Sequence, residues 1–146
     1  MRPLVILVMV FLTGCSSVPE APRDPVKEAW YGKTLGQLAP LVRDADAAFA
    51  NHKPDDAAVL IEKAEPLAKW VISVPHPTLA AAEAASDLDD LYGRMLLSNR
   101  HYGYARLLFQ KNQARWKYWQ PQTDDTARRL KQAQDAIAEC DRHIAG

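Results

Sequence analysis

The chain has little of what several common classes of protein require. Only 6 of its 146 residues are glycine and only 2 are cysteine, and its 18 basic residues balance its 18 acidic ones. A balanced charge offers no general attraction to nucleic acid or to an anionic membrane surface. With at most one disulfide available, we expect the fold to depend on the packing of a hydrophobic core.

Familiar catalytic motifs are also missing. The sequence has no GxSxG, glycine-rich phosphate loop, CxxC, HExxH or calcium-binding loop, and its histidines are scattered: His52, His76, His101 and His143. Cys140 and His143 have a spacing that can bind a metal, but Cys140 falls on an apolar stripe, where a free cysteine acts as a small hydrophobic residue. We therefore predict no enzymatic activity, no metal and no cofactor.

No apolar run in the chain is long enough to cross a membrane. The longest covers nine residues, 4–12, directly after Met1-Arg2. As a helix it would be about 14 Å long, well short of the ~30 Å hydrocarbon core of a bilayer. A basic start followed by a short apolar run is typical of a secretory signal peptide.

The residues after this run carry a more specific signal. Leu12-Thr13-Gly14-Cys15 resembles the lipobox of bacterial lipoproteins. The resemblance implies that Cys15 receives a diacylglyceryl group and that cleavage after Gly14 makes it the first mature residue. Ser16 at the next position is typical of transport to the outer membrane. The two or three acyl chains of such proteins form a persistent membrane anchor that would face this protein to the periplasm.

The segment after the cysteine predicts a tether. Residues 16–25 contain three prolines and almost no large apolar side chain, which favours a semi-extended chain. Asp24-Pro25 is suited to begin a short helix, and Gly32 to end it. The predicted organisation is therefore a signal peptide over 1–14, a lipidated tether over 15–33 and one domain over 34–146.

The domain is predicted to be all-α, with about five helices in antiparallel hairpins, because apolar spacing is helical throughout and no segment alternates with a period of two. The first helix is expected to begin at a capping box of Thr34 and Gln37, and Asp89 and Asp90 are expected to be solvated. Side chains expected in the core include Trp70, Phe109, Trp116, Leu130, Ala133, Ile137, Cys140 and Ile144.

Residues 86–111 resemble one tetratricopeptide repeat. Gly93 lies where the first helix of the repeat needs a small residue, and Ala105 and Phe109 follow at the repeat's offsets for a small residue and an aromatic one. Asn112 departs from the pattern, which has alanine there. The resemblance implies paired helices in close contact at Gly93.

A fainter copy covers residues 41–64. Ala45, Ala57 and Ile61 occur at the same relative offsets, and Ala57 lies 48 residues before Ala105. Tandem repeats of this family are about 34 residues apart, so the units do not form a regular array. An unrelated antiparallel helical bundle would have similar spacing, and both architectures remain open at this point.

The segment 100–119 interleaves basic and aromatic residues. Tyr102, Phe109 and Trp116 recur every seven residues and are expected to face the core. The candidate partner contacts, which fall elsewhere on this segment, are Tyr104, Arg115, Tyr118 and Trp119. Tyrosine, tryptophan and arginine are common anchors of interfaces, but simple helix packing with solvated basic ends would give the same pattern.

These observations predict a lipid-anchored periplasmic adaptor or structural component of a cell-envelope assembly, acting on an unidentified envelope protein. Nucleic acid is excluded as a partner because export separates it from the cytoplasm. The alternative is an envelope binding module that holds a small molecule, lipid or peptidoglycan fragment in a helical groove. An apolar cavity lined by Trp70, Trp116 or Trp119 would favour the binding module, and an exposed aromatic-basic patch would favour the adaptor. A third option, an enzyme, would need polar side chains that converge in a cleft.

Overall fold

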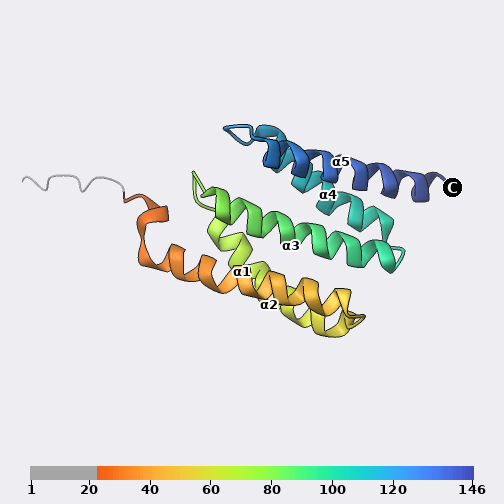
Figure 1. Ribbon diagram of the computed structural model, residues 1–146, viewed down its shortest axis with the longest axis horizontal. Coiled ribbons are helices and arrows are strands. Elements are labelled where there is room, and N and C mark those ends of the chain that lie inside the picture. Colours follow the sequence, from red (N-terminus) through yellow and green to blue (C-terminus); the bar gives the residue numbers. More distant parts are fainter. Residues whose placement is uncertain (1–22) are drawn as a thin grey trace, which may run out of the picture.

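The computed structural model describes residues 23–146 (Figure 1). The predicted signal peptide and the predicted lipidation site, with Gly14, Cys15 and Ser16, lie outside the described residues. The predicted all-α class with antiparallel hairpins is confirmed, since residues 23–146 contain helices and no strand. The elements are η1 (Pro25–Lys27), α1 (Ala29–Ala50), α2 (Pro54–Ile72), α3 (Leu79–Ser98), α4 (Tyr102–Tyr118) and α5 (Asp124–Ala145).

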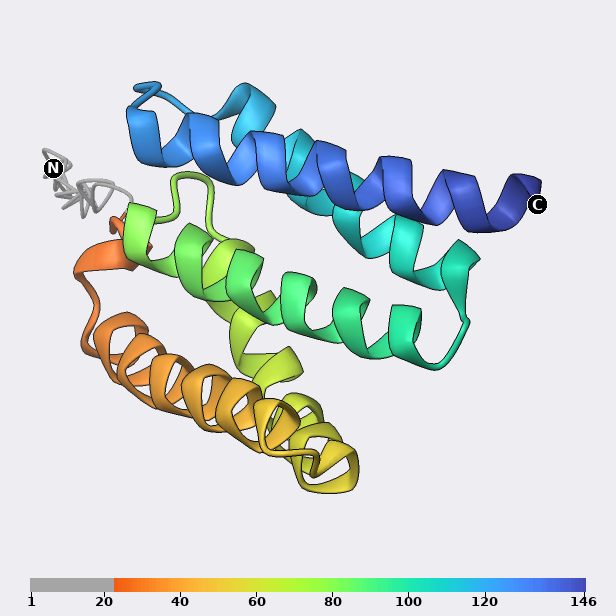
Figure 2. The ribbon, with the colours of Figure 1, turned by 45° about the vertical axis from the view of Figure 1, so that its right-hand side comes forward.

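The helices form a stack of two hairpins and a final helix. α1 packs on α2, α3 packs on α4, the two hairpins meet mainly through α3, and α5 covers α4. Because the helices alternate in direction, the starts of α1, α3 and α5 and the ends of α2 and α4 share one end of the stack, where the described chain begins (Figure 2). We call this the tether end, and the opposite one, which holds the C-terminus, the far end.

The first long helix begins earlier than predicted. Asp24 accepts a hydrogen bond from the Val26 amide, as expected for a cap, but η1 leads directly into α1 at Ala29. Gly32 does not end this helix, and Thr34 is not its cap, because Thr34 is buried inside α1 and donates its hydroxyl proton to the Trp30 carbonyl at 2.8 Å.

A contact with α3 explains this early start. Tyr31 is buried, and its hydroxyl accepts a hydrogen bond of 3.0 Å from the Thr78 amide. Thr78 is the N-cap of α3, so Tyr31 joins the start of α1 to the start of α3. The free energy of this tertiary contact outweighs the local preference of glycine for a helix end.

Both hairpin turns have the same geometry, offset by 48 residues. The residues His52 and Arg100 have φ values of 59° and 62°, in the left-handed region. Each turn follows a C-cap asparagine, Asn51 or Asn99, and forms the two backbone hydrogen bonds of a Schellman motif. The offset equals the sequence offset of Ala57 and Ala105, so the internal similarity extends from sequence to backbone.

The close helix contact predicted at Gly93 is confirmed. A Cβ atom at this position would lie 2.6 Å from two ring carbons of Phe109, which is fully buried. Only glycine therefore permits this approach of α3 and α4. At the equivalent positions of the first hairpin, Ala45 and Ile61 are also buried.

Two hydrophobic clusters form the core. The larger one spans α1, α2 and α3, and the smaller one packs Ala105 and Phe109 of α4 against Cys140 of α5. The predicted core position of Cys140 is confirmed. Trp70 and Ile144 are not core residues, because 54% and 55% of their surfaces are exposed. Both lie in the last turn of a helix, where the neighbouring helices cover them only in part.

We expect Gly93→Ala to lower the free energy of unfolding by about 1–2 kcal/mol, because the added methyl group overlaps the Phe109 ring. The matched control is Gly36→Ala, an exposed position in α1 where a Cβ would meet no atom within 4 Å. This control should raise stability by about 0.5–1 kcal/mol through helix propensity. Urea unfolding of both variants measures the difference, and equal effects would contradict the assigned contact.

Candidate functional site

Trp116 lies where α3, α4 and α5 meet. Its indole is fully buried, and Nε1 donates a hydrogen bond of 2.8 Å to Ser86 Oγ of α3. The Arg129 guanidinium of α5 lies 5.4 Å from the ring centroid, and Trp119 packs edge-on against the ring at 6.0 Å. The prediction of Trp116 as a core residue is confirmed, so this side chain does not line a binding cavity.

A polar network surrounds this contact. Asn112 donates a hydrogen bond of 2.9 Å to the Ser86 carbonyl and accepts one from Arg115. Arg115 also pairs with Asp89 at 2.9 Å, and Lys111 pairs with the other oxygen of Asp89 at 2.8 Å. Among residues 23–146, every buried side-chain nitrogen and oxygen has a hydrogen-bond partner.

One expectation from the sequence is wrong here. Asp89 is buried, not solvated, and only 11% of the Arg115 side chain is exposed. Arg115 therefore belongs to an internal ion pair, whereas its predicted role as a partner contact stays a prediction. Helical periodicity places charged residues on the solvent side and does not reveal an ion pair between two helices. Asn112, in the place of the repeat's alanine, is the one signal that pointed to this network.

Replacing Asp89 by alanine should lower the free energy of unfolding by about 2–3 kcal/mol, because Arg115 loses its counter-ion in a buried setting. Asp44→Ala is the control, since Asp44 forms an exposed pair with Arg43 at 3.7 Å. Its effect should stay within about 0.5 kcal/mol. Thermal or urea unfolding would test the comparison, and similar losses in the two variants would show that the network is energetically unimportant.

The outer face of α4 carries an exposed stripe. Tyr104, Leu107 and Tyr118 have exposed fractions of 70%, 59% and 74%. Together with exposed Lys111 and Ala114 they alternate in steps of three and four residues, which places them on one face of the helix, opposite its buried side. We call these five residues the outer stripe.

The structure separates the four predicted contacts. Tyr104 and Tyr118 lie on the outer stripe, about 21 Å apart along the helix axis. Trp119 follows the end of α4 and is half-buried against Trp116. Leu107 was missed by the sequence analysis, although its spacing from Tyr104 and Tyr118 could have identified it.

A cleft adjoins the outer stripe. It lies between α2 and α4, with α3 as its floor, and has a volume of about 610 Å³. Lys111 belongs to both the cleft and the stripe. Most of the lining is apolar, and it includes Pro66, Ile72, Leu88, Tyr92 and Leu108. The charged residues of the lining are Glu65, Lys69, Asp89 and Lys111. The surface is therefore an apolar groove beside an aromatic helix face.

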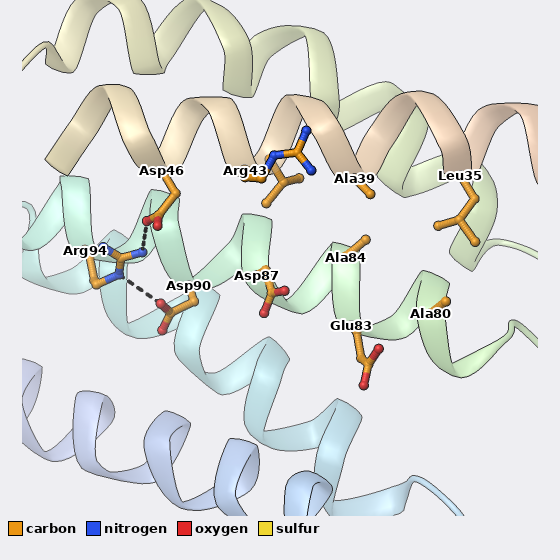
Figure 3. Close-up of a pocket in the computed structure, with 11 residues that line it drawn as sticks. Leu35, Ala39, Arg43, Asp46, Ala80, Glu83, Ala84, Asp87, Asp90 and Arg94 are labelled. Carbon is orange, nitrogen blue, oxygen red and sulfur yellow. Dashed lines mark hydrogen bonds and ion pairs between the residues drawn. The ribbon is translucent and has the colours of Figure 1, made fainter. Parts of the chain in front are cut away.

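A second cleft, of about 530 Å³, lies between α1 and α3 (Figure 3). Alanines on both helices leave this space open, and three of its six charged side chains pair with each other. Arg94 reaches from α3 to Asp46 of α1 at 2.7 Å and also binds Asp90 at 2.9 Å (Figure 3). Asp87 pairs with Arg129 of α5 at 2.6 Å. The lining mixes apolar and charged side chains, and these charged side chains do not form a converging catalytic set.

The Cys140 thiol is not poised for chemistry. Burial raises its pKa, and the neighbouring Glu139 and Asp141 carboxylates raise it further, so the thiol stays protonated at neutral pH. His143 stacks on Tyr102 with ring centroids 4.5 Å apart. Within the described part of the chain, no three His, Cys, Asp or Glu side chains are grouped as a metal site would require.

Comparison of the chain with protein-family models, with curated proteins and with solved structures gives no match. Within residues 23–146, no helix has both the length and the apolar character needed to span a bilayer. Any functional conclusion therefore depends on the contacts and surfaces of this chain alone.

Proposed function

We propose that this protein is a lipid-anchored adaptor of the bacterial cell envelope, which binds a protein partner through the outer stripe of α4. The anchor follows from the lipobox resemblance at Cys15, and Ser16 favours the outer membrane, facing the periplasm. The observation that carries the binding role is the row of exposed Tyr104, Leu107 and Tyr118 on one rigid helix face.

The composition of the stripe supports protein contact. Tyrosine gives a large amphipathic contact area for the loss of few rotatable bonds, and it is enriched among residues that dominate binding energy. Alternating steps of three and four residues match the spacing with which a partner helix would present its own side chains. The apolar cleft between α2 and α4 extends this surface beyond a single helix.

The inner face of α4 supports the same role. Trp116, Asn112 and Arg115 attach the helix to α3, and Arg129 of α5 covers the indole. A helix held in this way does not need to become ordered when a partner binds, so little conformational entropy is lost. The outer stripe is therefore a preorganised surface.

The alternative, a module that holds a small molecule, lipid or peptidoglycan fragment, has weaker support. Neither the α2–α4 cleft nor the α1–α3 cleft is lined by tryptophan, because Trp116 is core and Trp70 lies elsewhere on the surface. The α1–α3 cleft, with Arg43 and Glu83 in its wall, would suit a polar ligand such as a peptidoglycan fragment better than an acyl chain.

Acylation tests the anchor. Labelled palmitate should enter the native protein and the Cys140→Ala variant, and it should be absent from Cys15→Ala, because only Cys15 lies in the lipobox. An inhibitor of signal peptidase II should leave the native protein uncleaved and slower on a denaturing gel. Labelled Cys15→Ala protein, or processing that ignores the inhibitor, would refute the lipoprotein assignment.

Site-specific photocrosslinking in envelope membranes tests the adaptor role. A photoreactive side chain at position 104, 107 or 118 should capture one common protein, whereas the same side chain at exposed Ala138 of α5 should not. In the unlabelled protein, Tyr104→Ala with Tyr118→Ala should weaken binding of that partner by about tenfold or more, with helical content unchanged. Capture from position 43 or 83 instead would move the site to the α1–α3 cleft.

A further inference from the structure

All four tryptophans of the chain lie at the tether end of the stack. Trp30 is in the first turn of α1, Trp70 is in the last turn of α2, Trp116 is in the last turn of α4, and Trp119 follows that turn directly. Trp116 is buried and holds helices together, as described above. The other three reach the surface at this end, where the described chain begins (Figure 2).

We propose that the tether end is a membrane-facing surface, on which the stacked pair of Trp30 and Trp70 inserts into the headgroup region of the bilayer. The proposal rests on the lipid anchor at Cys15, and it adds a second contact that sets the orientation of the domain. The partner is thus the lipid surface itself.

The tryptophan pair has the character of an interfacial anchor. The two rings stack with centroids 5.0 Å apart at an interplanar angle of 17°, and Tyr31 packs edge-on against Trp30. Within residues 23–146, neither indole N–H has a hydrogen-bond acceptor, whereas the N–H of Trp116 has one. An apolar ring with an N–H that needs a partner is best placed between hydrocarbon and water, where tryptophan is enriched in membrane proteins.

The neighbouring surface fits the same environment. Leu79, exposed at the start of α3, and half-buried Val74 before it add apolar area at this end. Lys33, three residues after Trp30, and Lys69, directly before Trp70, are both exposed. Lysine can lay its stem along apolar surface and keep its ammonium group among headgroups, so these side chains tolerate the same depth.

The length of the tether restricts the distance from the membrane. Eight residue steps separate Cys15 from Arg23, and even a fully extended chain of this length spans at most about 29 Å. Arg23, at the tether end, therefore stays within this distance of Cys15. Acyl chains alone would hold the domain near the membrane without setting its orientation. Insertion of the tryptophan pair would orient α4 roughly perpendicular to the membrane, with Tyr118 near the bilayer and Tyr104 away from it.

Quenching by brominated lipid tests this contact. The full acylated protein is reconstituted into vesicles of phosphatidylethanolamine and phosphatidylglycerol, with or without bromine on the acyl chains. In the variant that keeps only Trp70 and Trp116, bromine should reduce the Trp70 emission by about twofold, as expected for a ring within 5–10 Å of the acyl boundary. The variant Trp30→Phe/Trp70→Phe/Trp119→Phe keeps Trp116 alone and supplies the unquenched background.

A matched control places a tryptophan at the far end. Tyr104→Trp in the background that retains only Trp116 should show no bromine quenching, because this exposed position is at the opposite end of α4. The single variant Trp70→Phe, which leaves Trp30 in place, serves if the multiple variants lose helical content. In this variant, brominated lipid should quench a smaller fraction of the total tryptophan fluorescence than it does in the native protein.

The outcomes separate the two proposals. If the protein floats with the vesicles but Trp70 is quenched no more than the indole introduced by Tyr104→Trp, the membrane-facing surface is refuted and the lipid anchor stands. If the protein does not float with the vesicles, both proposals fail. If Trp70 is shielded only when a protein partner is added, the tether end is a protein-binding surface and the membrane contact is refuted.

Discussion

The burial of one indole, that of Trp116, is the constraint on which the second half of the molecule depends. A single side chain meets Ser86 of α3 and Arg129 of α5, and the polar groups around it are satisfied by Asn112, Arg115 and Asp89. Besides this contact, α5 is held by the smaller apolar cluster around Phe109 and Cys140 and by its ion pairs with α3 and α4, such as Arg129 with Asp87. The same contact holds α4 in place, so the contacts on the buried face of this helix also fix the position of its exposed face.

Much of the fold could be predicted from apolar spacing, because helices that pack on one another must bury one face each. The close approach at Gly93 was also readable, since only a missing side chain permits it. The early start of α1 was not, because it depends on Tyr31 reaching Thr78 in another helix. The ion pair of Asp89 and Arg115 was missed for the same reason, and Trp70 because periodicity does not show where neighbouring helices end.

The surfaces of the molecule divide by chemistry. The α1–α3 cleft combines apolar and charged side chains, with Arg94 as a bridge between its two walls (Figure 3). The outer stripe of α4 is aromatic and faces solvent, and the tether end exposes stacked tryptophan. These surfaces suit a domain whose tether end faces lipid and whose outer stripe faces a protein. The α1–α3 cleft, bridged by Arg94, would then serve to hold α1 and α3 at their distance.

The interior contains an unusual share of the smallest apolar side chain. Of the 21 buried hydrophobic residues within 23–146, ten are alanine, and four of these lie in the first two turns of α3. Where such methyl groups lie between packed helices, away from the two clefts, a larger side chain would push the helices apart. The chain can therefore diverge freely in surface chemistry, but growth of one interior residue requires a matching reduction across the helix interface. Related sequences should vary at these positions in compensating pairs, with the summed side-chain volume preserved.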